Sequence, residues 1–235
     1  MKILVISLDG AVPELLFGEE RLVNFRYLMQ YGCYGRLGGV VPPTSIPGWM
    51  CLATSQDPGS LGIFGSSHRL DRSYNVALPV GWEAVQARAI WDQVAQSGGR
   101  TITIGVPGSL PPKSHNGISI DWSPTPDHGK DICIHPSFLQ DEIYQAIGHY
   151  RVDVNEASTG DMGRLRDEIF STSRRRFAVA RHLLAHHEWD FFQYVDLGLD
   201  RVQRNFWQFH DPAHALHGSD NAYSDVIRDY YVHLD

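Results

Sequence analysis

The chain has 235 residues, of which 43% are hydrophobic, and its formal net charge is −7. This length and composition are those of a globular protein with one hydrophobic core. The negative charge argues against non-specific binding of nucleic acid, which depends on clustered Lys and Arg. The basic run Arg174–Arg176 lies in a predicted helix and is expected to be solvated.

The cysteine content and the N-terminus both favour a cytoplasmic location. Cys33, Cys51 and Cys133 have no metal-ligand spacing, and such a sparse, odd set predicts buried thiols in a reducing compartment. Residues 1–10 lack the long apolar segment of a signal peptide, and the apolar run within them is too short to span a membrane. We therefore expect neither a membrane nor a nucleic-acid polymer among the partners.

The first predicted element is a strand. Residues 3–8 are apolar apart from Ser7, which predicts a short, buried parallel strand with Asp9 at its carboxyl end. Open α/β sheets assemble their functional sites at that end. A helix is predicted over residues 24–30, ended by Gly32.

A second short strand is predicted over residues 36–41, followed by a hydroxyl-bearing turn. Proline favours the first position of a helix, so Pro47 is predicted to begin a helix that runs to Thr54. Ser45 then lies beside the positive end of this helix, which favours an alkoxide and the phosphate that it attacks.

The remaining elements continue the alternation of strands and helices. The sequence predicts a helix over 84–97, a strand over 101–106, a loop over 107–131, a helix over 164–187 and a strand over 191–197. Asp200 follows the last of these strands. The alternation predicts an α/β fold with a mostly parallel central sheet flanked by helices.

The C-terminal segment carries an apolar stripe at helical spacing, formed by Tyr223, Val226, Ile227, Tyr230, Tyr231 and Leu234. The chain stops at Asp235 within this pattern. We therefore expect a fragment of a longer protein, in which a partner chain or a missing C-terminal half covers residues 222–235.

Several motifs occur in register with those of a known family. They are Asp9-Gly10, Pro42-Pro43, Ser45-Ile46-Pro47, Trp49 and the glycine-rich segment 57–65, with further matches at 105–112, 174–184, 189–201 and 206–214. In these motifs the chain resembles the alkaline phosphatase superfamily, in its nucleotide pyrophosphatase/phosphodiesterase-like branch. The resemblance implies an alkaline-phosphatase-like fold, here incomplete. Trp49 stands where the sulfatase branch has an arginine, which disfavours that branch.

The resemblance implies a metal-dependent hydrolase of phosphate esters that acts on a phosphorylated small molecule. Ser45 would be the nucleophile, with Thr44 as its rival. Asp9 and Ser45 would bind one divalent cation, zinc or manganese, and Asp200 would bind the second. Two metals about 4 Å apart can clamp a phosphoryl group in this way.

One residue departs from the family pattern. Arg204 stands where the family has a histidine ligand, and a guanidinium cannot coordinate a cation. The resemblance also places three further ligands in a C-terminal half that residues 1–235, taken as one domain, lack. We therefore expect at most one bound metal. The alternative is a truncated, non-catalytic relative that binds a phosphorylated ligand or a protein partner.

Structural roles compete with these assignments. Asp9 could be a turn residue before Gly10, Ser45 a plain N-cap, and Asp200 the N-cap of a helix over 201–209. His210, His214 and His217 have helical spacing but are expected to be surface histidines.

Overall fold

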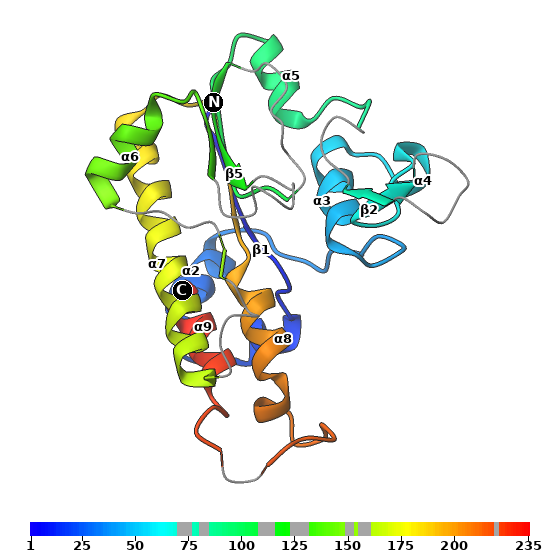
Figure 1. The fold of residues 1–235 in the computed structure, drawn as a ribbon, viewed down its shortest axis with the longest axis vertical. Helices are drawn as coiled ribbons and strands as arrows, with labels where there is room; N and C mark the ends of the chain where they lie inside the picture. The colour runs from blue at the N-terminus through cyan, green and yellow to red at the C-terminus, as the bar shows by residue number, and fades with distance from the viewer. Residues whose placement is uncertain are drawn as a thin grey trace. The chain divides into compact units, whose positions relative to one another are not determined.

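The computed structural model describes residues 1–69, 77–79, 85–107, 116–122, 132–148, 153–154, 161–218 and 221–235. The chain divides into two compact units (Figure 1). The first comprises Met1–Ile6, Gly38–Val152 and Phe177–Val195, and the second comprises Ser7–Leu37, Asp153–Arg176 and Asp196–Asp235.

The first unit is built on a five-stranded sheet. Its order is β1 (Ile3–Leu8), β7 (Phe191–Asp196), β4 (Thr101–Ile104), β5 (Gly117–Trp122) and β6 (Ile132–His135). β4 is parallel to both β7 and β5, with Thr101 opposite Phe191 and Gly117, whereas β6 is antiparallel to β5. The mostly parallel sheet predicted from the alternation is confirmed.

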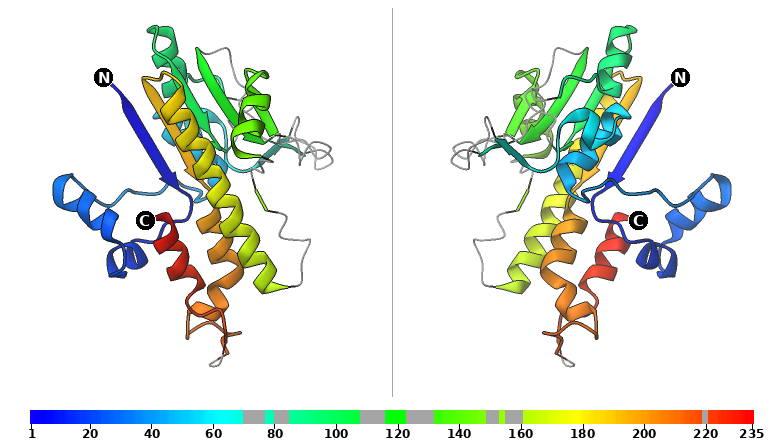
Figure 2. Two further views of the ribbon diagram at one scale, coloured as in Figure 1. Left: turned by 90° about the vertical axis from the view of Figure 1, so that its left-hand side faces the viewer. Right: turned by 90° about the vertical axis from the view of Figure 1, so that its right-hand side faces the viewer.

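Helices cover this sheet because its strands are apolar on the side that faces them. The core combines side chains of β4, β5 and β7 with side chains of α6 (Leu139–Ile147) and of the second part of α7 (Met162–His186). Ile104, Ile143 and Leu183 represent these layers and are at most 1% exposed. Figure 2 shows the second part of α7 beside the sheet strands. Burying such side chains contributes roughly 1.5–3 kcal/mol each.

β1 is less buried than its sequence predicts. Ile3, Leu4 and Ile6 are 42%, 46% and 55% exposed. β1 is an edge strand with β7 as its one hydrogen-bonded neighbour among the described residues, and none of its side chains belongs to the core packed on this sheet. An apolar run therefore identified the strand correctly but not its burial.

The first unit contains further elements, some of which the sequence did not predict. They are α3 (Ser45–Thr54), α4 (Pro58–Leu61), β2 (Ser67–Arg69), antiparallel to β3 (Ala77–Pro79), and α5 (Ile90–Gln96). No strand forms over residues 36–41, which are irregular. The predicted helix over 84–97 begins only at Ile90, since Val85 and Ala89 are buried without being helical. The predicted loop contains β5, and residues 108–115 and 123–131 lie outside the described residues.

The second unit is helical. It contains α1 (Pro13–Gly18), α2 (Val23–Tyr31), the first part of α7, α8 (Gly198–His210) and α9 (Val226–Leu234). Its core joins Leu165 and Ile169 of α7, Leu199, Val202 and Phe206 of α8, and Val226, Ile227, Tyr230 and Tyr231 of α9. The spacing of three and four residues on each helix explains why these side chains meet.

This packing corrects the expectation that a partner or a missing half covers residues 222–235. Tyr230, Tyr231 and Ile227 are 0% exposed because α8 and α7 of the same chain cover the stripe. The exposed large apolar side chains of this unit include Val23, Tyr27, Leu28 and Tyr31 of α2, which buries none of its residues. Asp235 also has a local role, since its carboxylate accepts hydrogen bonds from the backbone N–H groups of Asn24 (3.0 Å) and Phe25 (2.7 Å) at the start of α2.

Two smaller expectations are also corrected. Cys33 and Cys133 are exposed rather than buried. Arg176, at the end of the basic run, is 2% exposed and so is not solvated. Among the described residues, no helix is long and apolar enough to cross a membrane.

Candidate functional site

The candidate site forms where two parallel strands end. Asp9 directly follows β1, Asp196 is the last residue of β7, and the Asp9 N–H donates to the Asp196 carbonyl at 2.9 Å. The Ile3 N–H donates to the Asp190 carbonyl at 2.8 Å with the same residue offset, so the strands run parallel. Their carboxyl ends therefore deliver two acidic residues to one edge of the sheet.

Gly10 lets the start of α8 approach this edge closely. Its φ is 79°, a conformation that favours glycine, and its carbonyl accepts a hydrogen bond of 2.5 Å from the Gln203 amide. A Cβ atom at position 10 would lie 3.3 Å from the Asp200 Cα. Asp200 thus lies on the same edge as Asp9, as predicted, and Gly10 is more than a turn residue.

Asp200 is not the N-cap of its helix. α8 begins at Gly198 with Leu197 as N-cap, so Asp200 lies in the first turn and Arg204 one turn later on the same face. The Asp200 Oδ2 accepts hydrogen bonds from Arg204 Nη2 at 2.8 Å and from Arg201 Nη1 at 2.6 Å. Two guanidinium groups therefore neutralise the carboxylate that the resemblance assigns to a metal.

Arg201 joins Asp200 to a further acid, Asp153. The Arg201 Nη2 lies 2.6 Å from Asp153 Oδ2, and its Nε lies 3.2 Å from both carboxylate oxygens. The Arg201 side chain is 16% exposed, whereas that of Arg204 is 59% exposed. Sequence reasoning missed Asp153, because no local pattern connects it to a residue 48 positions away.

The electrostatics of the edge are concentrated on Asp9. Burial, followed by the nearby charge of Asp200, raises the pKa of Asp9 from 3.8 to about 6, although Arg201 and Arg204 oppose the shift. A buried carboxyl beside other acids is a frequent sign of a functional site. A divalent cation at Asp9 would reverse the shift, because it favours the charged carboxylate.

Asp196, at the end of β7, stabilises this edge through buried hydrogen bonds. It is 0% exposed, and its carboxylate accepts hydrogen bonds from the Tyr230 hydroxyl (2.9 Å), the Gly198 N–H (3.0 Å) and the Ser173 hydroxyl (3.2 Å). A Cβ atom on Gly198 would overlap the Tyr230 hydroxyl. Sequence reasoning missed this network, which a glycine two residues after a strand-end acid could have indicated.

Ser45 lies in the first unit, whereas Asp9 and Asp200 lie in the second. It is the first residue of α3 and is exposed, with Thr44 as N-cap. Pro47 is therefore the third helical residue rather than the first, and Ser45 is not a plain N-cap. Its position at an exposed helix N-terminus is compatible with binding an anion.

The three C-terminal histidines have structural contacts. His210 and His217 lie within hydrogen-bonding distance of the carbonyls of Ser224 (3.2 Å) and Gln208 (3.1 Å). His214 accepts from the Leu216 N–H at 3.1 Å. Among the described residues these histidines form no metal-binding group.

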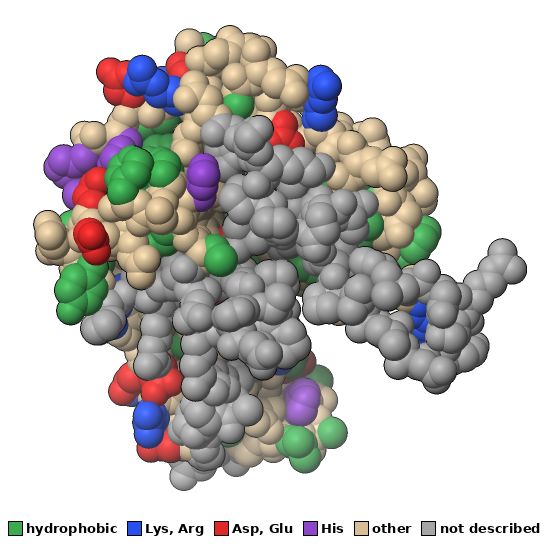
Figure 3. Space-filling view, turned by 45° about the horizontal axis from the view of Figure 1, so that its top comes forward, with side chains coloured by type: hydrophobic (Ala, Val, Ile, Leu, Met, Phe, Trp, Pro, Cys, Tyr) green, Lys and Arg blue, Asp and Glu red, His purple; other side chains and the backbone are tan. Residues whose placement is uncertain are grey.

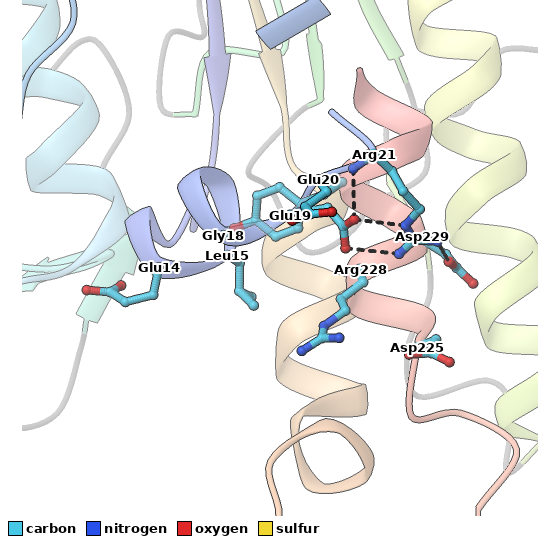
Figure 4. Close-up of a pocket in the computed structure, with 10 residues that line it drawn as sticks. Glu14, Leu15, Gly18, Glu19, Glu20, Arg21, Asp225, Arg228 and Asp229 are labelled. Carbon is cyan, nitrogen blue, oxygen red and sulfur yellow. Dashed lines mark hydrogen bonds and ion pairs between the residues drawn. The ribbon is translucent and has the colours of Figure 1, made fainter. Parts of the chain in front are cut away.

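A separate hollow of about 600 Å³ lies in the second unit between α1 and α9 (Figure 4). Its charged lining consists of Glu14, Glu19, Glu20, Asp225 and Asp229 with Arg21 and Arg228. Arg21 pairs with Glu19 at 2.9 Å and with Asp229 at 2.8 Å, and its hydrogen bonds lower the pKa of Glu19 to about 2. The excess of carboxylates disfavours a phosphate ligand there.

Comparison with solved structures identifies the class of fold. The whole chain matches phosphonoacetate hydrolase from Sinorhizobium meliloti in complex with phosphonoformate, with a TM-score of 0.56 and 14% sequence identity. It also matches murine ectonucleotide pyrophosphatase/phosphodiesterase 5, with a TM-score of 0.55 and 17% identity, and the inactive variant of that protein in complex with AMP. The chain covers 53% and 50% of these two proteins and so spans about half their length. The fold is alkaline-phosphatase-like.

The family follows from the sequence. The profile of the family described as type I phosphodiesterase / nucleotide pyrophosphatase matches residues 3–235, so the chain belongs to this family. Comparison with curated proteins gives no match. The resemblance drawn from the motifs is thereby confirmed.

Proposed function

We propose that the protein is a metal-dependent hydrolase of phosphate esters, of the phosphodiesterase or nucleotide pyrophosphatase type. The observation that carries the proposal is the acidic edge, where Asp9 has a pKa of about 6 beside Asp200. Membership in the family supports the reaction type. The AMP and phosphonoformate bound to proteins of the same fold support a phosphorylated small molecule as substrate.

In this proposal Ser45 is the nucleophile, and Asp9 and Ser45 hold one divalent cation. A carboxylate and a hydroxyl suit a cation that accepts oxygen donors, such as manganese or zinc. Bound there, the cation would lower the pKa of the attacking hydroxyl and polarise the phosphoryl oxygen. The exposed N-terminus of α3 would favour the negative charge of the phosphate beside Ser45.

The residues fit a second cation poorly. Asp200 is the donor proposed for it, but Arg201 and Arg204 both donate to its Oδ2. A cation there would have to displace these guanidinium groups and would be repelled by them. We therefore expect at most one weakly held metal at this edge, bound through Asp9 and Ser45, and little turnover by this chain.

The test is metal content and hydrolysis of bis-p-nitrophenyl phosphate for the chain and for Arg204→His. Because a nearby opposite charge commonly shifts an acid's pKa by 1–3 units, removing the arginine should raise metal affinity by about tenfold or more. Arg204→Gln is the matched control, since it removes the charge without adding a ligand. A larger gain in Arg204→His than in Arg204→Gln supports a ligand position at residue 204.

Asp9→Asn should abolish metal uptake at this edge, and Ser45→Ala should abolish any hydrolysis. Two metals that both depend on Asp9 or Asp200, with Ser45-dependent turnover in the unmodified chain, would show that the ligands are misplaced. Arg204 would then be a contact for the substrate phosphate.

A second function is favoured by Arg204 itself. Its side chain is 59% exposed, so the guanidinium can reach a ligand while one nitrogen stays on Asp200. In this alternative the chain binds a phosphorylated ligand without hydrolysis, and arginine is well suited to phosphate. Metal-independent AMP binding that Arg204→Gln abolishes, with no turnover, would favour the alternative over the hydrolase.

A further inference from the structure

A group of three metal-ligating side chains lies in the first unit. Glu142 of α6, His182 of α7 and His187 just beyond α7 offer ligand atoms that all lie within 4.8 Å of one another. The Glu142 Oε1 lies 2.7 Å from His182 Nε2 and 2.8 Å from His187 Nε2. The space-filling view shows histidines gathered beside acidic side chains on the side where α6 lies (Figure 3).

We propose that Glu142, His182 and His187 bind one zinc ion, which fastens α6 to the C-terminal end of α7. Two imidazole nitrogens and one carboxylate oxygen form a donor set that zinc uses, with water completing a tetrahedron. This site shares no residue with Asp9, Ser45 and Asp200. It therefore stands whether or not the protein is a hydrolase.

The separations of Glu142 from His182 and from His187 need little change to admit the ion. Zinc–ligand bonds of about 2.0–2.2 Å in a tetrahedron place the ligand atoms about 3.3 Å apart, roughly 0.5 Å more than the present hydrogen bonds. Each imidazole would move its proton from Nε2 to Nδ1, so that Nε2 can coordinate. The hydrogen bonds from His187 and His182 already hold the pKa of Glu142 below its usual range, which keeps the carboxylate charged.

The surroundings hold two of these ligands on rigid elements. The neighbours of Glu142 and His182 in sequence, Ile143 and Leu183, are buried in the same core and anchor the two helices against each other. The side chains of His182, His187 and Glu142 are 19%, 24% and 35% exposed, so an ion can reach them from solvent. A site built on packed helices keeps its donors in place before the ion binds.

The sequence alone points to a different pair. His182 and His186 are four residues apart on α7, the spacing at which two helical histidines usually share a metal. In the structure these two rings stack instead, with centroids 4.4 Å apart, and the His186 Nδ1 lies 2.9 Å from the His182 carbonyl. His186 is therefore a natural control, because it neighbours the group without being a ligand.

The experiment compares zinc binding by the metal-stripped chain, Glu142→Gln, His187→Ala and His186→Ala. Calorimetric titration with zinc chloride and elemental analysis after desalting give the stoichiometry. We expect Glu142→Gln and His187→Ala to lose one equivalent of zinc and His186→Ala to keep it. Cobalt(II) should give a tetrahedral visible absorption band in the unmodified chain that the first two variants lose.

Stability gives a second readout. Zinc at a hundred times its dissociation constant should raise Tm by about 5–10 °C, because it binds only the folded chain. A zinc-dependent rise in Tm that persists in Asp9→Asn but is absent in His187→Ala is due to the proposed site. Equal stoichiometry in all four proteins, or equal loss in His186→Ala and His187→Ala, would overturn the proposal.

Discussion

Asp200 in the second unit and Glu142 in the first each have one carboxylate oxygen in contact with two basic side chains, but the two pairs of basic side chains differ in their chemistry. Asp200 accepts two hydrogen bonds on Oδ2, from Arg201 and Arg204, and Glu142 Oε1 lies within hydrogen-bonding distance of His182 and His187. A guanidinium stays protonated and has no lone pair to offer, whereas a neutral imidazole can coordinate a metal. Whether a carboxylate can hold a metal thus depends on the basic groups around it.

The two carboxylates also differ in how firmly the fold holds them. The edge around Asp200 rests on Asp196, which is 0% exposed and bonded to Tyr230 and Gly198. The Glu142 side chain is 35% exposed at the rim of its core. Substitutions at the acidic edge should therefore change stability more than substitutions at Glu142.

The largest effect is expected for Gly198→Ala. The new methyl group would overlap the Tyr230 hydroxyl inside a packed core, which should lower the free energy of unfolding by roughly 2–4 kcal/mol. Urea unfolding measures the change. Gly18→Ala is the matched control, because no atom lies within 4 Å of its added Cβ, and it should not destabilise the chain.

Tyr230→Phe should lower the free energy of unfolding by about 1.5–3 kcal/mol, since its hydroxyl donates to a buried acid. Tyr231→Phe removes a hydroxyl bonded to the uncharged Val12 N–H at 2.7 Å and should cost only about 1 kcal/mol. Thermal and urea unfolding of both variants test the difference. Equal losses would mean that the charge of Asp196 adds nothing to its hydrogen bond.

Asp9→Asn should stabilise the metal-free chain at pH 8 by about 1–2 kcal/mol, a value reduced for partial exposure. The folded pKa of about 6 lies above the unfolded value of 3.8. The contribution of protonated Asp9 is therefore complete below about pH 4 and is lost as pH rises through about 6. Unfolding from pH 4 to pH 8 should show a flatter profile in the variant. A profile unchanged by the substitution would contradict the raised pKa.

The smallest effect is expected for Glu142→Gln without metal, less than about 1 kcal/mol, because the site is partly solvated. His187 and His182 lower the pKa of Glu142, so its contribution is present above the unfolded value of 4.5 and is lost as pH falls through the lower, folded value. Unfolding at pH 7 and at pH 3 gives the comparison. If Glu142→Gln lowered the free energy of unfolding as much as Gly198→Ala does, the expected difference in stability between the two regions would be contradicted.

Local patterns in the sequence predicted much of the fold. The strands β1 and β4 correspond to the apolar run at 3–8 and the β-branched run at 101–106. The helix α7 corresponds to the long helical pattern at 164–187. These predictions succeeded because strand and helix periodicities are properties of neighbouring residues. They also placed Asp9 and Asp200 on one edge, since parallel strands end together.

The failures have a common physical cause. Residues 36–41 have strand-like composition, but a strand needs a hydrogen-bonding partner that the sequence does not name. The apolar spacing before Ile90 reflects burial of Val85 and Ala89 outside a helix. The stripe on α9 is covered by α8 rather than by another chain, which only packing decides.

By itself, the sequence determined the order of the principal strands and helices, the family, and the acids at the strand ends. The tertiary structure decided which basic side chain contacts which acidic side chain. Arg204 is four residues from Asp200, a pairing that helix geometry predicts, whereas Asp153 is 48 residues from Arg201 and Glu142 is 40 residues from His182. Contacts over such separations depend on how whole elements pack, because no local periodicity relates the residues that form them.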